Sequence, residues 1–198
     1  MNLRPALAAA LLLALSGCVA FEQAPAAALS CDPALAGRWR TIGDGPGRDI
    51  AIDAQCRAQW PVHGGTVEVT LRSYAEGPLR YLILTPPEAE QMLGSDGAGL
   101  SALVPADSVF IAAYRIQDQR LRGWLPDADL VRESVQAGKL RGRLLKRDGE
   151  SNDNATVLMQ NDAQSLAALL ERGPEPLFGR LDAPGSEAIK LKRIGAVK

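Results

Sequence analysis

The sequence predicts a mainly β domain of short antiparallel strands, interrupted by about three short helices. Two observations indicate this class: apolar and polar residues mostly alternate from residue 37 onward, and glycine- or proline-containing turns separate the alternating segments. Many short strands joined as hairpins would leave unpaired backbone groups at the edges of an open sheet. We therefore expect an antiparallel up-and-down barrel or half-barrel with helices over its openings, and a two-sheet β-sandwich is the alternative.

Residues 1–17 have the features of an export signal. Arg4 supplies a positive charge, and residues 6–15 form an apolar run that is shorter than the roughly 20 residues of a membrane-spanning helix. The run ends in the tetrapeptide LSGC at 15–18, which resembles the lipobox of bacterial lipoproteins: a branched apolar residue, two small residues and a cysteine. The resemblance implies cleavage before Cys18 and attachment of lipid chains to it.

The same resemblance implies an address and a domain organisation. A lipid-bearing Cys18 would hold the protein at the cell envelope through the membrane, and Val19 in place of an aspartate after the cysteine implies the outer membrane, facing the periplasm. Residues 18–30 are small, rich in alanine and interrupted by Pro25, so we expect a flexible tether there. Residues 31–198 form the single folded domain.

Two cysteines remain once Cys18 is assigned to lipid. An exported protein lies in an oxidising compartment, and an even number of cysteines favours a Cys31–Cys56 disulfide, with two reduced and buried thiols as the alternative. Closing a loop of this length stabilises the fold by about 3.5 kcal/mol. The chain has one histidine, so the sequence predicts no metal site and no histidine-based catalysis.

The strands follow from the alternation. The clearest is 66–72, where Val67, Val69 and Leu71 point one way and polar residues the other, whereas 108–116 is apolar on both faces and is expected to be central. Ten strands are expected in all, at 38–42, 49–53, 66–72, 79–84, 108–116, 120–125, 140–145, 155–159, 177–181 and 187–194.

Capping residues predict the three helices. Thr85 and Glu88 form a capping box, with prolines at the first helical positions. Asp127 or Asp129 begins a second helix that ends at Gly138, and Asp162 begins a third with a stripe of leucines.

The start of the first strand suggests a ligand-binding family. Gly37-Arg38-Trp39 resembles the G-x-W motif of lipocalins, in which the tryptophan closes one end of the barrel. The resemblance implies a lipocalin-like domain in which Arg193 of the last strand packs on the Trp39 ring, and a hollow barrel that binds a small apolar ligand such as a fatty acid or other lipid. Candidate cavity residues are Val67, Val69, Leu71, Ile111 and Tyr114.

A second candidate surface is basic. Lys139, Arg141 and Arg143 alternate along one expected strand, and Lys146 and Arg147 follow. These residues could contact anionic head groups, and a solvated strand face is the alternative.

Composition and motifs limit the function classes. Lysine and arginine number 22 against 23 acidic residues, a balance that lacks the basic excess of most nucleic-acid-binding proteins. The sequence has no G-x-S-x-G elbow and predicts no catalytic residue and no cofactor. We therefore expect an envelope lipoprotein whose β-barrel binds an apolar ligand. The alternative is a non-enzymatic interaction module for an envelope protein, with a solid interior.

Overall fold

The computed structural model describes residues 18–43, 46–76, 79–147, 149, 154–183, 185–186 and 189–196. The predicted signal peptide at 1–17 lies outside the described residues. Within them, twelve strands form one sheet: β1 (Val19–Phe21), β2 (Gly37–Thr41), β3 (Asp49–Ile52), β4 (Arg57–Val62), β5 (Gly65–Thr70), β6 (Arg72–Glu76), β7 (Leu79–Leu84), β8 (Val109–Gln117), β9 (Arg120–Trp124), β10 (Gly142–Leu145), β11 (Thr156–Met159) and β12 (Ile189–Gly195).

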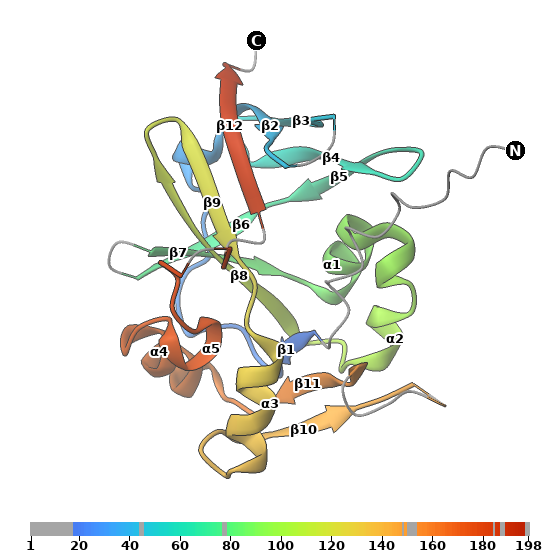
Figure 1. The fold of residues 1–198 in the computed structure, drawn as a ribbon, viewed down its shortest axis with the longest axis vertical. Coiled ribbons are helices and arrows are strands. Elements are labelled where there is room, and N and C mark those ends of the chain that lie inside the picture. Colours follow the sequence, from blue (N-terminus) through green and yellow to red (C-terminus); the bar gives the residue numbers. More distant parts are fainter. Residues whose placement is uncertain are drawn as a thin grey trace, which may run out of the picture.

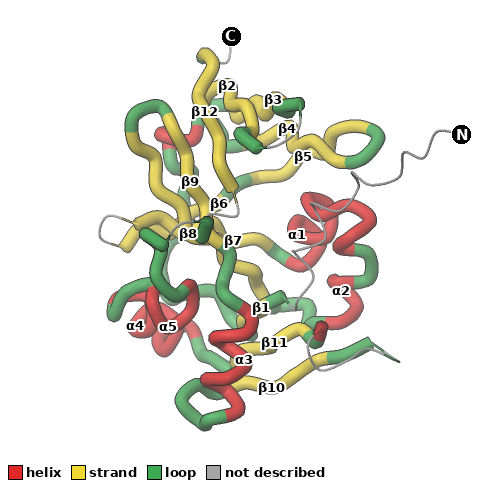
Figure 2. Tube along the Cα trace, viewed as in Figure 1, coloured by secondary structure: helices red, strands yellow, loops and turns green. Residues whose placement is uncertain are grey.

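Helices lie on two sides of this sheet. In Figure 1 and Figure 2, α1 and α2 stand at the right and the other three gather in the lower part of the molecule. The α-helices are α1 (Pro86–Leu93), α2 (Leu100–Leu103), α3 (Ala128–Gln136), α4 (Ala163–Glu171) and α5 (Glu175–Phe178), and two short 3₁₀ turns are η1 (Pro33–Leu35) and η2 (Gly94–Gly97).

The mainly β, mostly antiparallel class is confirmed, but the sheet is not closed within the described residues. Its order is β10-β11-β1-β8-β9-β12-β2-β3-β4-β5. Outside this order, β8 also pairs with β7, and β7 pairs with β6. Consecutive strands pair in the runs β2–β5 and β6–β9, as in an up-and-down sheet. The two ends of the chain break that order. β12 lies between β9 and β2, and β1 lies between β8 and β11, parallel to β11.

The predicted tether at 18–30 is wrong for the described chain. Val19, Ala20 and Phe21 are at most 4% exposed and form a strand inside the sheet. Ser30 pairs with Ser73 through two backbone hydrogen bonds of 2.8 and 3.0 Å. Composition predicted flexibility, whereas Val19–Phe21 pair with β8 on one side and with β11 on the other.

Other elements also differ from expectation. The segment predicted as a strand at 177–181 begins with the last two residues of helix α5, Leu177 and Phe178, which are buried in the first core. The turns η1, η2 and α2 and the strand β6 were not predicted. Neither was β4, which contains Pro61; that proline lies beyond the part of β4 that pairs with β3, so its missing amide costs no ladder bond there.

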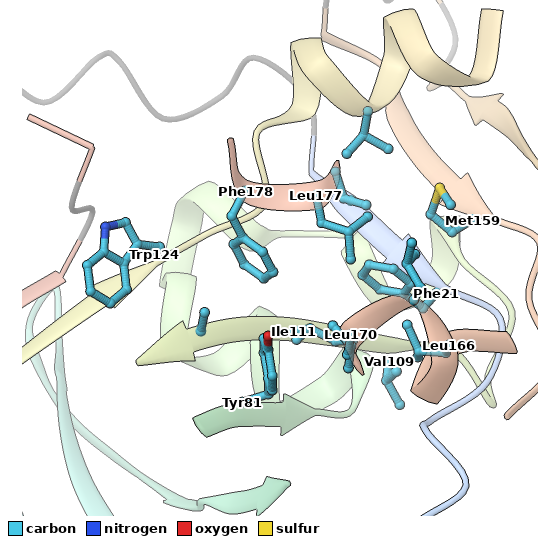
Figure 3. Packing of buried hydrophobic residues seen from close by; sticks show 14 of the residues in the cluster. Phe21, Tyr81, Val109, Ile111, Trp124, Met159, Leu166, Leu170, Leu177 and Phe178 are labelled. Carbon is cyan, nitrogen blue, oxygen red and sulfur yellow. The ribbon is translucent and has the colours of Figure 1, made fainter. Parts of the chain in front are cut away.

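Strand β8 separates two apolar cores. Val109, Ile111 and Ala113 face the first core, which α3, α4 and α5 cover (Figure 3). Phe110 and Tyr114 face the second core, which contains Trp39, residues of β2–β5 and residues of α1 and α2. The expectation that this strand is central and apolar on both faces is confirmed.

Candidate functional site

Cys18 lies where the chain enters β1. Its carbonyl accepts a 2.8 Å hydrogen bond from the Val157 amide, and its partly exposed side chain packs against the second core. Burial raises the pKa of the Cys18 thiol, and the nearby positive charge of Arg147 opposes that shift to a smaller extent. Because a thiol must ionise to act as a nucleophile, the folded domain disfavours modification of Cys18, whereas a chain with β1 not yet docked would not.

The predicted basic segment forms an exposed edge. Lys139, Arg141 and Arg143 are all exposed, the first two just before β10 and the third within it. Among the described strands, β10 pairs with β11 alone. Cations on an edge strand hinder unwanted pairing with other chains, so the solvated-face alternative also accounts for them.

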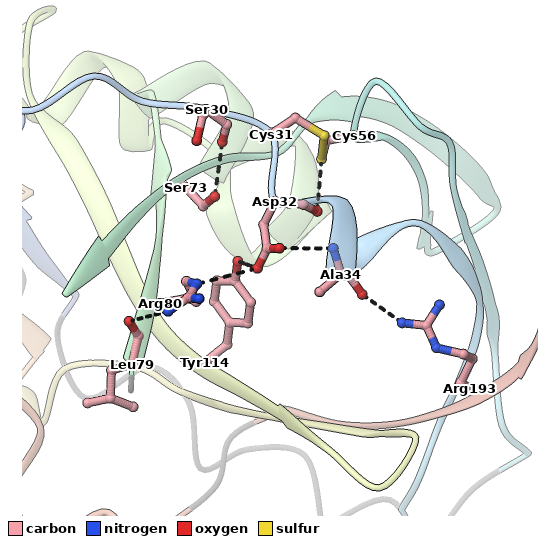
Figure 4. A network of polar contacts seen from close by, with 10 residues as sticks. All are labelled: Ser30, Cys31, Asp32, Ala34, Cys56, Ser73, Leu79, Arg80, Tyr114 and Arg193. Carbon is pink, nitrogen blue, oxygen red and sulfur yellow. Dashed lines mark hydrogen bonds and ion pairs between the residues drawn. A yellow bond between two sulfur atoms is a disulfide. The ribbon is translucent and has the colours of Figure 1, made fainter. Parts of the chain in front are cut away.

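The predicted disulfide is confirmed. Cys31 and Cys56 are bonded, with their Cα atoms 5.5 Å apart. Beside it, the Asp32 carboxylate accepts hydrogen bonds from the Ala34 amide at 2.9 Å and the Tyr114 hydroxyl at 2.7 Å, and lies 3.8 Å from Nε of Arg80 (Figure 4). This network attaches the segment before β2 to the centre of the sheet.

The structure also brings Trp39 and Arg193 together. The Arg193 guanidinium lies 4.1 Å from the centroid of the Trp39 ring and donates to the carbonyls of Ala34 and Ala36. Gly37 has φ +147°, and a Cβ there would overlap the same guanidinium, which explains why a glycine precedes this tryptophan. Because strand pairing leaves the sheet open within the described residues, a role for Trp39 as a barrel plug stays a prediction.

The candidate cavity residues do not form one set. Val69, Leu71 and Tyr114 are buried in the second core, and Val67 packs against it. Ile111 lies in the first core, on the opposite face of β8. Positions 111 and 114 lie an odd number of positions apart along β8, so their side chains point to opposite faces of the sheet.

Two surface hollows of the described part of the molecule are lined by none of the five candidate cavity residues. One, of about 260 Å³, lies beside Arg193 and Gly37. The other, of about 380 Å³, has an apolar floor that includes Tyr81 and Leu170. Its rim carries both signs of charge: Arg115, Glu171, Glu175, Arg180 and Asp182.

A stronger basic surface lies on three neighbouring strands. We call it the cationic face; two positions each of β2, β9 and β12 point outward on it: Arg38, Arg40, Arg120, Arg122, Lys190 and Lys192. All six residues are exposed, while the residues between them, Trp39, Leu121 and Leu191, are buried in the second core. Lys192 lies directly opposite both Arg120 and Arg40, and Lys190 lies opposite Arg122.

Sequence reasoning missed this surface although a signal exists. Each strand contributes a cation-x-cation triplet, RWR, RLR and KLK, with an apolar residue in the middle. The triplets are far apart in the chain, and only the insertion of β12 between β9 and β2 places them side by side. By contrast, the basic residues at 139–147 lie close together in the chain, so the sequence alone predicts that they share a surface.

No group of three or more histidine, cysteine, aspartate or glutamate side chains within the described residues could hold a metal ion. None of the helices in the described part of the chain has the length and hydropathy needed to cross a bilayer. No protein-family description, curated protein or solved structure is similar to this chain.

Proposed function

We propose that this chain is a lipid-anchored protein of the bacterial envelope that acts as a non-catalytic interaction module. The cationic face carries the proposal, because it places six exposed cations on three neighbouring strands, whereas both apolar cores consist of buried side chains. The anchor is supported by the lipobox-like LSGC at 15–18, and the Cys31–Cys56 disulfide is typical of an exported protein.

The position of β1 adds a geometric consequence to this proposal. Cys18 is followed at once by a buried strand, so a lipid on Cys18 would emerge directly from the domain. The domain would then rest at the membrane surface instead of moving on a tether. The burial of β1 and of the Cys18 thiol also favours lipid attachment before β1 enters the sheet.

Labelled palmitate incorporation in a Gram-negative host tests the anchor. We expect label in the wild-type chain and in Ser16→Ala, which keeps a small residue in the lipobox, and none in Cys18→Ala. Fractionation should place the labelled protein with the outer membrane. Equal behaviour of the wild type and Cys18→Ala in both measurements would overturn the anchor.

A hollow lipocalin-like barrel remains the competing proposal, and the same protein tests it. Fatty acids and lysophospholipids should leave the thermal unfolding midpoint unchanged, because the candidate cavity residues line neither of these two hollows. A saturable rise in the midpoint that Val69→Trp abolishes would favour ligand binding over the interaction module.

A further inference from the structure

The cationic face carries a charge arrangement that folding does not require. Like charges directly opposite one another on paired strands are destabilising, and here Lys192 faces Arg120 on one side and Arg40 on the other. Exposed strand positions accept neutral β-forming residues such as threonine at no cost in packing. Three adjacent strands that each carry two exposed cations side by side therefore indicate an external counter-charge.

Internal contacts neutralise part of this face. Asp49 on β3 pairs with both Arg38, at 3.3 Å, and Arg40, at 2.7 Å, so one carboxylate is shared by two cations. Arg122 and Lys190 also have interaction partners. Within the described residues, Arg120 and Lys192 have no ion-pair partner, so these two cations keep their positive charge uncompensated.

We propose that the cationic face docks onto the phosphate head groups of an anionic lipid bilayer. Four of the six cations are arginines, whose planar guanidinium donates two parallel hydrogen bonds to phosphate oxygens. The cations are arranged in two dimensions, about 4.8 Å apart between strands and about 6.8 Å along them. Such a plane matches a membrane surface, whereas a linear polymer is usually held in a groove.

Two further observations favour a bilayer. Ile42 and Ile194, which follow the cations on β2 and β12, are exposed by 47% and 39%, and apolar side chains beside cations can enter the interfacial region of a membrane. The aromatic residues of β2 and β9, Trp39 and Trp124, are buried, so a nucleic-acid base could not stack on them. Each cation near an anionic surface contributes about 1 kcal/mol to binding.

This inference deepens the proposed function, since it names the partner of the exposed surface, but its test does not need the lipid on Cys18. The full chain with Cys18→Ser is mixed with phosphatidylcholine vesicles, with or without phosphatidylglycerol, and the bound fraction is measured by flotation. Residues 1–17 are present in every variant, so any binding that they cause cancels in the comparison. The quantity of interest is the part of binding that depends on phosphatidylglycerol and salt.

Arg120→Gln/Lys192→Gln is the test variant. We expect the phosphatidylglycerol-dependent affinity to fall about 30-fold, from two cations at about 1 kcal/mol each and tenfold per 1.4 kcal/mol. The matched control is Arg141→Gln/Arg143→Gln, which removes the same charge from the edge at β10 and should bind within about twofold of the parent, because charges distant from the contact are screened. The test variant should unfold at the same temperature as the parent or a higher one, since it removes like-charge contacts.

Three results would overturn the proposal. Equal weakening by the control variant would show that binding follows total charge or uses β10. Vesicle binding that does not depend on phosphatidylglycerol would show that the cationic face takes no part in it. Binding of soluble inorganic polyphosphate without binding to the vesicles would assign the face to a polyanion in solution. A chain that takes up no palmitate in cells yet binds these vesicles through Arg120 and Lys192 would overturn the anchor and leave this inference standing.

Discussion

The hydroxyl of Tyr114, in the middle of β8, donates a 2.7 Å hydrogen bond to Oδ2 of Asp32, which lies 82 residues earlier in the chain. Tyr114 is 1% exposed, and the Asp32 side chain is 13% exposed. The pair therefore joins the segment that carries the disulfide to the central strand, at a point where water is nearly excluded.

The first prediction concerns alkaline pH. Burial, and then the hydrogen bond to the Asp32 carboxylate, raise the pKa of Tyr114 well above its ordinary value. Above a pH of about 10 the unfolded chain loses the phenolic proton and the folded chain keeps it, so stability should fall as pH rises through this range and be unaffected below it. Urea unfolding from pH 7 to 11 measures this decline.

Tyr114→Phe removes both the hydrogen bond and the group that titrates, and the two losses appear in different pH ranges. The variant should lose about 1.5–3 kcal/mol at pH 7, because one hydrogen bond to a carboxylate is gone. Its stability should then decline less steeply than that of the wild type above pH 10. If the free energy of unfolding fell equally in both proteins above pH 10, the decline would not come from Tyr114.

Arg193 should stabilise the domain although its charge is partly exposed. Arg193→Ala removes the contact with Trp39 and the hydrogen bonds to two carbonyls near η1, and we expect a loss of about 2–3 kcal/mol in the free energy of unfolding. Arg193→Lys should recover less than half, because an ammonium cannot reach both carbonyls and the ring face together. Arg143→Ala, an exposed arginine elsewhere, serves as the control, and an equal effect there would contradict the assignment.

The disulfide should contribute about 3.5 kcal/mol, given a sequence separation of 25 residues. Cys31→Ala/Cys56→Ala should therefore show a lower urea midpoint, and the wild type should fall to the same midpoint in reductant. A wild type whose midpoint is unchanged when both thiols are shown to be reduced would mean that the Asp32 network alone holds this segment.

The sequence predicted those features that depend on local pattern. Alternation predicted the strand around Val69, and a continuous apolar run predicted β8. The Thr85–Glu88 and Asp162 caps predicted α1 and α4. The failures involve position in the sheet. The residues of β1 and β12 have no local pattern that predicts the insertion of these strands between strands from the middle of the chain. The cationic face depends on that insertion, and so does the burial of the segment taken for a tether.

Phe21 gives the sharpest test of that insertion. It is fully buried in the first core, and the Glu22 amide beside it donates to the Met159 carbonyl at 3.0 Å. Phe21→Ala should therefore cost about 3–5 kcal/mol in the free energy of unfolding, as for other buried aromatic side chains. Gln23→Ala, two residues further on and exposed, should change it by less than about 0.5 kcal/mol. If residues 18–30 were a flexible tether, both substitutions would be silent, so equal and negligible effects would contradict the buried strand.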